Sequence, residues 1–409
     1  MLRIHPFKAI RPSPGFEARV ASLPYDVVTT EEARELARDN PYSFLHVVRS
    51  EIDLPPDTNP YDARVYLQAK ETFERFQREG VLMRDTATRF FLYRQAWRHS
   101  VQVGLLCCCH VDDYEKDIIK KHERTRKVKE DDRTRHVLTL NANAGPVFLA
   151  YRDVPDITAL MERDINTRPL YHFTAVDGVT HSLWPVDDWE SYARLFAGVP
   201  CAYVADGHHR AASAWRAGQE RRKHNPRHTG KEEYNWFLSC LFPASHLRIL
   251  PYNRVVKDLH GLSHDEVLRR FSAFGEVAPI VEPMPRRAGT FGFYLGDRWR
   301  RLTLDESTID HTDPIGSLDV SLLQDRVLTP IFGIGDPRTD ERIDFVGGIR
   351  GPEHLERLVQ HGEAAIAFTM FPTTMEQLMA VADAGLVMPP KSTWFEPKLR
   401  SGLVVHTLD

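Results

Sequence analysis

The chain lacks the features that mark several classes of protein. It has only 5 cysteines, three of them contiguous, and no Cys-x-x-Cys pair, so we expect neither a disulfide framework nor a cysteine zinc site. No apolar stretch approaches the roughly 18 residues that span a bilayer, and the first six residues do not resemble a signal peptide. Acidic and basic residues nearly balance, at 57 against 53, which does not favour nucleic acid or an anionic membrane as a partner. We therefore expect a cytoplasmic protein with reduced cysteines.

The composition that remains is that of an ordinary globular protein. Hydrophobic residues make up 42% and charged residues 27% of 409 residues, a length that allows two or three domains. Strand-like runs such as 147–151 and 291–295 alternate with helical patterns such as 61–80, which indicates an α/β fold. Thr29 and Glu32 have capping-box spacing and predict a helix that begins there. We place a soft domain boundary near residue 260.

The most informative segment is Cys201–Trp215, where an apolar run breaks at Asp206-Gly207 and an alanine-rich helical pattern follows. This pattern predicts a strand, a tight loop and a helix. The first N–H groups of a helix lack internal partners and carry about half a positive charge, so an anion binds well there. Arg210 can fork onto phosphate oxygens, and His208 and His209 add donors that also take protons. Alternatively, Asp206 caps the helix, Gly207 turns the chain and Arg210 is a surface charge.

A second segment, Lys120–His136, is dense in charge and has almost no apolar residue to bury. It is either a solvated, mobile loop or a wall of a site for a polyanion. Its candidate site residues are His122, Glu123, Thr125 and Arg133.

The third segment, Met388–Gly402, is too polar for a core and too rich in aromatic residues for a disordered tail. Two prolines fix an extended backbone. It is either a structural strap over the N-terminal domain or a segment that reaches a phosphate or carboxylate across the domain interface. The candidate contacts here are Lys391, Ser392, Thr393 and Lys398, to which we add Arg254 from an otherwise apolar strand pattern.

Nearly end to end, the chain resembles a bacterial and archaeal family of unknown function. The resemblance is carried by Pro24–Val28, Asn40–Leu45, His122-Glu123-x-Thr125, Ala205–Arg210 and Met388–Lys398. The Asp-Gly-His-His-Arg loop in turn resembles the phosphate-binding loop of the ParB and sulfiredoxin-like nucleotide-binding fold, which includes kinases of free L-serine.

This resemblance implies a mixed α+β fold with a ParB/sulfiredoxin-like core. The core region would span residues 1–260, with a large insertion at about 55–200. A C-terminal α/β region, residues 261–409, would pack on it and contribute the segment 388–398.

The resemblance also implies a reaction, which is nucleotide-dependent transfer of a phosphoryl group to a small hydroxyl compound, most simply free L-serine. ATP or ADP and Mg²⁺ would be the cofactors, and the small molecule the partner; oligomeric state is not indicated. Residues 206–210 would hold phosphates. Asp26 matches the acidic residue that deprotonates the acceptor, with Glu123 as rival base, and His209 is a further catalytic candidate. Mg²⁺ would be held by Glu123 or Asp206, and Tyr25 would contact the substrate.

Three alternatives stay open. A phosphatase would need the same phosphate loop. A metal-dependent hydrolase would use His122, Glu123, His208, His209 and His136, although adjacent histidines on a helix diverge by ~100° and no His-Glu-x-x-His is present. A non-catalytic nucleotide-binding regulator would need a basic DNA-binding helix-turn-helix, and we find none in the sequence.

Overall fold

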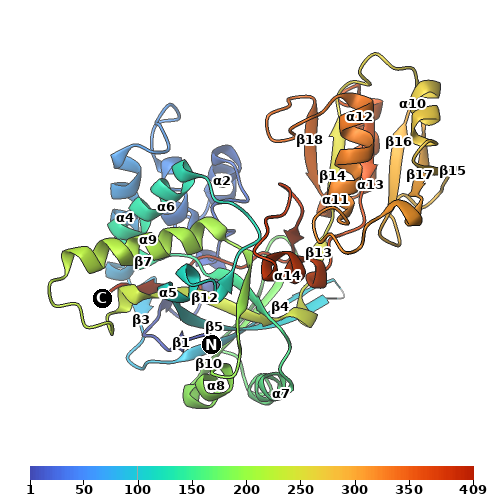
Figure 1. Ribbon diagram of the computed structural model, residues 1–409. Coiled ribbons are helices and arrows are strands. Elements are labelled where there is room, and N and C mark those ends of the chain that lie inside the picture. Colours follow the sequence, from blue (N-terminus) through green and yellow to red (C-terminus); the bar gives the residue numbers. More distant parts are fainter. Residues whose placement is uncertain (99) are drawn as a thin grey trace. The chain divides into compact units, whose positions relative to one another are not determined.

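The computed structural model describes residues 1–98 and 100–409 (Figure 1). The chain divides into two compact units, the first made of Met1–Leu247 and Pro397–Asp409 and the second of Arg248–Glu396. Each unit contains both helices and sheets, so the mixed α+β class is confirmed. Within the described ranges, every helix is too short or too polar to cross a membrane.

The first unit is built on a nine-stranded sheet in the order β6-β11-β8-β12-β5-β4-β10-β9, with β1 paired to β5. Most neighbours are antiparallel, but β12 with β8 and β11 with β6 are parallel. Its strands are β1 Ile4–His5, β4 Phe90–Trp97, β5 Ser100–His110, β6 Ile119–Lys120, β8 Val147–Tyr151, β9 Tyr171–Thr174, β10 Thr180–Val186, β11 Ala202–Asp206 and β12 Trp236–Pro243. The three contiguous cysteines lie fully buried in β5, and all five cysteines are free.

Helices pack around this sheet in two groups: in Figure 1, α7 and α8 lie together, and α4, α6 and α9 lie together elsewhere. Side chains of α7, α8 and α9 share one hydrophobic core with the sheet. The helices of this unit are α1 Glu17–Val20, α2 Thr30–Ala37, α3 Leu45–Val48, α4 Ala63–Arg78, α5 Val111–Glu115, α6 Lys127–Leu140, α7 Pro155–Asp164, α8 Trp189–Phe196 and α9 His208–His224. The expected capping box is confirmed: Thr29 accepts from the Glu32 N–H while Glu32 accepts from the Thr29 N–H.

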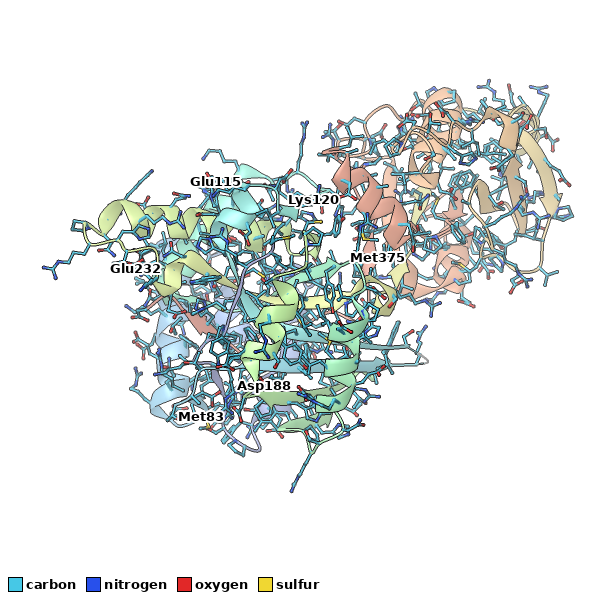
Figure 2. The ribbon with its side chains drawn as sticks, turned by 60° about the horizontal axis from the view of Figure 1, so that its bottom comes forward. Met83, Glu115, Lys120, Asp188, Glu232 and Met375 are labelled. Atoms are coloured by element: carbon cyan, nitrogen blue, oxygen red, sulfur yellow. The ribbon has the colours of Figure 1, made fainter. Side chains whose placement is uncertain are left out.

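Short strand pairs complete the first unit. These are β2 Ile10–Pro12 with β3 Leu82–Arg84, and β7 Ala142–Asn143 with β21 His406–Thr407. The second pair ties the end of the chain beside α6. Figure 2 marks Met83 in β3 and Glu115 at the end of α5.

The charged segment differs from its expected form, because residues from Lys127 onward form helix α6. The helix buries Asp132, His136, Val137 and Leu140 on one face. A solvated loop is therefore the wrong interpretation for this part. Helical periodicity is hidden in the sequence because two of the four buried positions are polar.

The strand, loop and helix predicted around Gly207 are confirmed. β11 ends at Asp206, Gly207 has a φ of 96°, and α9 begins at His208. Alanines and Gly218 let α9 pack closely, since a Cβ at 218 would lie 2.7 Å from the Tyr234 carbonyl oxygen.

The second unit is a six-stranded antiparallel sheet in the order β15-β17-β16-β19-β14-β18, with a separate pair of β13 and β20. Its strands are β13 Ile249–Leu250, β14 Tyr252–Val256, β15 Gly275–Pro279, β16 Thr290–Leu295, β17 Arg298–Leu304, β18 Ile343–Gly347, β19 Ile366–Thr369 and β20 Trp394–Phe395. Its helices are α10 His264–Phe271, α11 Asp319–Leu323, α12 Thr329–Phe332, α13 Pro352–Gln360 and α14 Met375–Asp383, with a π-helical turn, Gln324–Leu328, between α11 and α12.

Candidate functional site

The N-terminus of α9 carries no side-chain cap. Gly207 occupies the N-cap position, and no side chain there accepts a hydrogen bond from the first turn. The alternative in which Asp206 caps the helix is therefore wrong. The N–H groups of the first turn remain available to an anion, and the helix dipole favours negative charge at this point.

Arg210, in that first turn, has N–H donors that are not used in hydrogen bonds. Its Nη1 donates to the carbonyl of Pro146. Its Nη2 lies 3.7 Å from a carboxylate oxygen of Asp26 and 3.7 Å from one of Asp206, which is too long for hydrogen bonds. Its Nε is buried and has no hydrogen-bond partner among the residues that the structure describes. Burial by itself would lower the pKa of Arg210, but Asp26 and Asp206 outweigh it and raise the pKa.

Gly207 lies close to that guanidinium and has a backbone conformation that favours glycine. A Cβ at 207 would lie 3.0 Å from both Cζ and Nε of Arg210. The positive φ also disfavours any other residue. The loop and the arginine are thus fitted to each other.

Asp206 lies between two cations. Lys398 donates from Nζ to its carboxylate at 3.1 Å, and Arg210 lies on its other side. Burial would raise the pKa of Asp206, but Lys398 and then Arg210 outweigh burial and hold that pKa well below its usual range. Asp206 is therefore an anion across the physiological pH range.

Two histidines meet beside the loop. The rings of His122 and His208 lie 4.5 Å apart and nearly perpendicular, and Nδ1 of His208 lies 3.5 Å from the Glu123 carboxylate. Burial lowers the pKa of His122 to about 4, and burial together with His122 lowers the pKa of His208. Both rings are therefore neutral at pH 7. In the described part of the chain, no group of three or more His, Cys, Asp or Glu side chains is arranged to hold a metal ion, so the hydrolase alternative finds no ligand set there.

His209 and Thr125 are already engaged. Nε2 of His209 accepts from the Arg126 N–H at 3.1 Å, and Thr125 donates to the Glu130 carboxylate. Burial and then Arg126 lower the pKa of His209, which keeps the ring neutral and able to accept.

A small cavity of about 40 Å³ lies beside the first turns of α9. Tyr25, Arg133 and Arg210 all line it, and the Arg133 guanidinium lies 4.2 Å from the centre of the Tyr25 ring. Burial, followed by the charge of Asp26, raises the pKa of Tyr25, which therefore keeps its proton. Three residues singled out separately in the sequence thus share one cavity.

The other predicted contacts lie in the second unit and are described within it. Arg254 is buried in β14 and donates from Nη2 to the Lys391 carbonyl at 3.0 Å; burial lowers its pKa to about 9. Ser392 donates to the Pro389 carbonyl, and Thr393 is partly buried just before β20. Their role as phosphate contacts stays a prediction.

Several residues of the site were not found from the sequence. Pro146 offers only its carbonyl and Arg126 only its N–H, so neither has a side-chain signal. His136, considered from the sequence only as a metal ligand, and Ser401, which lies in the segment Met388–Gly402, both line the cavity, and neither was predicted to do so.

A family model described as "Protein of unknown function (DUF1015)" matches residues 4–321. The chain belongs to the DUF1015 family. The predicted membership of an uncharacterised family is thereby confirmed. No curated protein matches this DUF1015 chain.

Solved structures similar to this DUF1015 chain include a free serine kinase in complex with AMP, at 15% identity and a TM-score of 0.34, covering 73% of this chain and 91% of the kinase. SbnI with a C-terminal truncation, from Staphylococcus aureus, is similar at 10% identity and a TM-score of 0.37, covering 72% and 85%. A conserved hypothetical protein from Pyrococcus furiosus is similar at 15% identity and a TM-score of 0.33, covering 73% and 93%. Both the sequence identities and the TM-scores of these three structures are low.

Proposed function

We propose that the protein is a nucleotide-dependent kinase that transfers a phosphoryl group from ATP or ADP to a small hydroxyl compound, with free L-serine as the first candidate. The observation that carries the proposal is the buried Arg210 guanidinium, which has unbonded donors at an uncapped helix N-terminus. Buried polar groups are nearly always satisfied, so the unbonded Nε of Arg210 needs an explanation, and the one we propose is a bound oxyanion. An oxyanion supplies what both the arginine and the helix lack.

The positions of the carboxylates support transfer rather than binding alone. Asp26 faces Nη2 of Arg210 from 3.7 Å, so a general base stands beside the proposed phosphate site. In the proposed step the acceptor hydroxyl oxygen forms a bond to the terminal phosphorus, the bond from that phosphorus to the nucleotide oxygen breaks, and the hydroxyl proton passes to Asp26. The nucleotide leaves with one phosphoryl group fewer.

Charge on the transferred group is balanced by Arg210 and Lys398. Asp206 holds Lys398 in place through the contact at 3.1 Å, so we assign Asp206 a positioning role. Fixed cations of this kind stabilise the developing negative charge without reorganising during the reaction.

Mg²⁺ fits this site as a partner of the nucleotide rather than as a resident ion. Mg²⁺ is commonly held by one or two carboxylates together with substrate phosphates. Asp206 is occupied by two cations, so Glu123 is the carboxylate we propose for this role, and when bound the ion would neutralise phosphate charge.

The test is phosphorus NMR of the purified protein with ATP or ADP, Mg²⁺ and a panel of hydroxylated amino acids. We expect a new phosphomonoester resonance that grows as the donor is consumed. A thermal-shift titration with the same nucleotides shows separately whether they bind. Nucleotide binding without transfer to any acceptor would eliminate the kinase and leave a regulator. Release of inorganic phosphate from a phosphorylated acceptor, without transfer from nucleotide, would indicate a phosphatase.

A further inference from the structure

The cavity beside the first turns of α9 has an unusual balance of charge. Arg133 and Arg210 both line it, and none of the described residues in its lining is acidic. His136 adds no charge, because burial lowers its pKa to about 4. Apolar side chains such as Val147 and Phe237 form much of the remaining wall. The carboxylates that balance these arginines lie outside the lining. They are Asp132 beside Arg133, and Asp26 and Asp206 beside Arg210. The cavity therefore presents guanidinium groups in apolar surroundings, which suit a small anion.

The two arginines are prepared for such a ligand in different ways. Arg133 is fixed by Asp132, which accepts from Nε at 2.8 Å and from Nη2 at 3.0 Å, and by the Tyr25 ring on its face. Asp132 also accepts from the Tyr66 hydroxyl, at 2.8 Å. Arg210 instead has a buried Nε without a partner in the described ranges. A guanidinium has five N–H donors, so Arg210 can serve this cavity and the phosphate site together.

The size of the cavity selects the group that enters. A single water needs roughly 10–15 Å³ of such space, so about 40 Å³ holds about three atoms. A carboxylate group has three heavy atoms, whereas a nucleoside base is several times larger. Arg210 lines the cavity and its Nη2 lies 3.7 Å from the Asp26 carboxylate, so the proposed base is near one of the two arginines of the cavity.

We propose that this cavity binds the carboxylate of the acceptor, between Arg133 and Arg210, and that the acceptor is therefore a short hydroxy acid or hydroxy amino acid. The inference rests on the proposed function, because it assigns the second substrate of that reaction. It adds that the free carboxylate is required and that Arg133 determines specificity.

The experiment compares L-serine with L-serinamide, which keeps the hydroxyl and amine but lacks the carboxylate. We expect L-serinamide to lose about 100-fold in kcat/KM, because buried donors would be left unpaired. Arg133→Gln should raise the KM for L-serine about 10- to 100-fold and leave the KM for nucleotide unchanged. The matched control is Arg135→Gln, on the exposed side of the same helix, which should change neither.

Calorimetric titration of L-serine, without nucleotide, separates this inference from the kinase itself. Binding that is weakened by Arg133→Gln, with no transfer, would support the carboxylate pocket and overturn the kinase. Equal turnover of L-serine and L-serinamide would overturn the pocket and leave the kinase in place. Absence of both binding and transfer would overturn the pocket. The comparison of the two acceptors on the unaltered protein decides the matter even if Arg133→Gln does not fold.

Discussion

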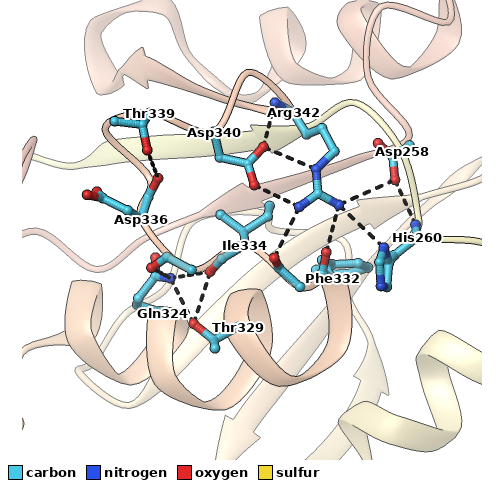
Figure 3. Close-up of polar contacts among 12 residues, drawn as sticks. Asp258, His260, Gln324, Thr329, Phe332, Ile334, Asp336, Thr339, Asp340 and Arg342 are labelled. Carbon is cyan, nitrogen blue, oxygen red and sulfur yellow. Dashed lines mark hydrogen bonds and ion pairs between the residues drawn. The ribbon is translucent and has the colours of Figure 1, made fainter.

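Arg210 in the first unit and Arg342 in the second make opposite use of the same side chain. Arg342 donates from Nε and Nη2 to the Asp340 carboxylate, at 3.1 and 2.7 Å. Its Nη1 donates to the Phe332 carbonyl at 2.9 Å and its Nη2 to the Gly333 carbonyl at 3.1 Å (Figure 3). Arg210 has one carbonyl, and its carboxylates lie 3.7 Å away.

We interpret Arg342 as an arginine that stabilises the fold, and we propose that Arg210 is available to a ligand. Leaving a buried donor unbonded costs about 1–3 kcal/mol. Nε of Arg49 and Nε of Arg89 also lack hydrogen-bond partners among the described residues, so the unbonded Nε alone does not set Arg210 apart; the uncapped helix N-terminus beside it does. Arg342 has acceptors for its donors. Arg210 is more buried, with a side chain 12% exposed against 31%, and yet has fewer.

The largest effect we expect is at the carboxylate that faces Arg210. Asp26→Asn should lower phosphoryl-transfer turnover by about 10²- to 10⁴-fold with little change in nucleotide affinity, because the amide keeps the shape and loses the proton acceptor. The rate is measured by phosphorus NMR. Asp340→Asn, beside Arg342, is the matched control and should leave turnover unchanged. Full activity in Asp26→Asn would move the role of base to Glu123.

The next effect concerns the guanidinium itself. Arg210→Ala should weaken binding of nucleotide by about 1.5–3 kcal/mol, the range for a charged hydrogen-bond partner. Calorimetry gives the affinity, and circular dichroism checks that the variant folds. Arg342→Ala should not alter the affinity. A folded Arg210→Ala protein that binds nucleotide as tightly as before would contradict the anion site.

The two units should also respond to pH in opposite directions. Burial lowers the pKa of His122 and of His136 from 6.5 to about 4 in the first unit, and it raises the pKa of Asp319 from 3.8 to about 7 in the second. The contribution of these histidines to the free energy of unfolding is complete above pH 6.5. It is lost as the pH falls to about 4, by up to ~1.4 kcal/mol per pH unit for each histidine. The Asp319 contribution is full below pH 3.8 and is lost as the pH rises through 7.

Hydrogen exchange followed by mass spectrometry, between pH 4.5 and 6.5, measures the protection of backbone amides in both units in one sample. The intrinsic exchange rates must first be corrected for pH. We expect protection in the first unit to increase with pH. Protection around α11 should decrease with pH, and Asp319→Asn should remove that decrease. Parallel pH trends in the two units would show that these groups do not govern stability.

The smallest effect is expected on stability, at the partly exposed Arg342, whose N–H donors all have acceptors. Arg342→Gln should lower the melting midpoint of the second unit by about 2–4 °C, because part of its bonding is lost while solvent replaces the rest. Differential scanning calorimetry with exchange mapping assigns the transition. Loss of stability in the first unit instead would show that Arg342 acts outside its own surroundings.

Local signals were sufficient for part of this molecule. An apolar run that breaks at Asp206-Gly207 and restarts as an alanine-rich pattern can only be a strand, loop and helix, and the Thr29 capping box likewise marked a real helix start. Helix α6 was missed because its buried face carries Asp132 and His136, and periodicity arguments count apolar residues.

The tertiary part of the site was beyond local signals. Lys398 contacts Asp206, 192 positions away in the chain; the sequence marked Lys398 as a residue that could reach a phosphate or carboxylate, but nothing in it identifies Asp206 as the partner. The shortage of partners around Arg210 is likewise a property of three dimensions, since a sequence contains acids and carbonyls without their distances. The resemblance to a known family supplied Asp26, which composition and spacing alone would have left as a turn residue.

The return of Pro397–Asp409 to the first unit has a consequence for how the protein is made. A ribosome releases Asp206 and Arg210 early, then the whole second unit, and Lys398 only afterwards. Until Lys398 and β21 have been synthesised, the contact of Lys398 with Asp206 and the pairing of β21 with β7 cannot form. The segment Pro397–Asp409 therefore joins the first unit only after the whole second unit has been made.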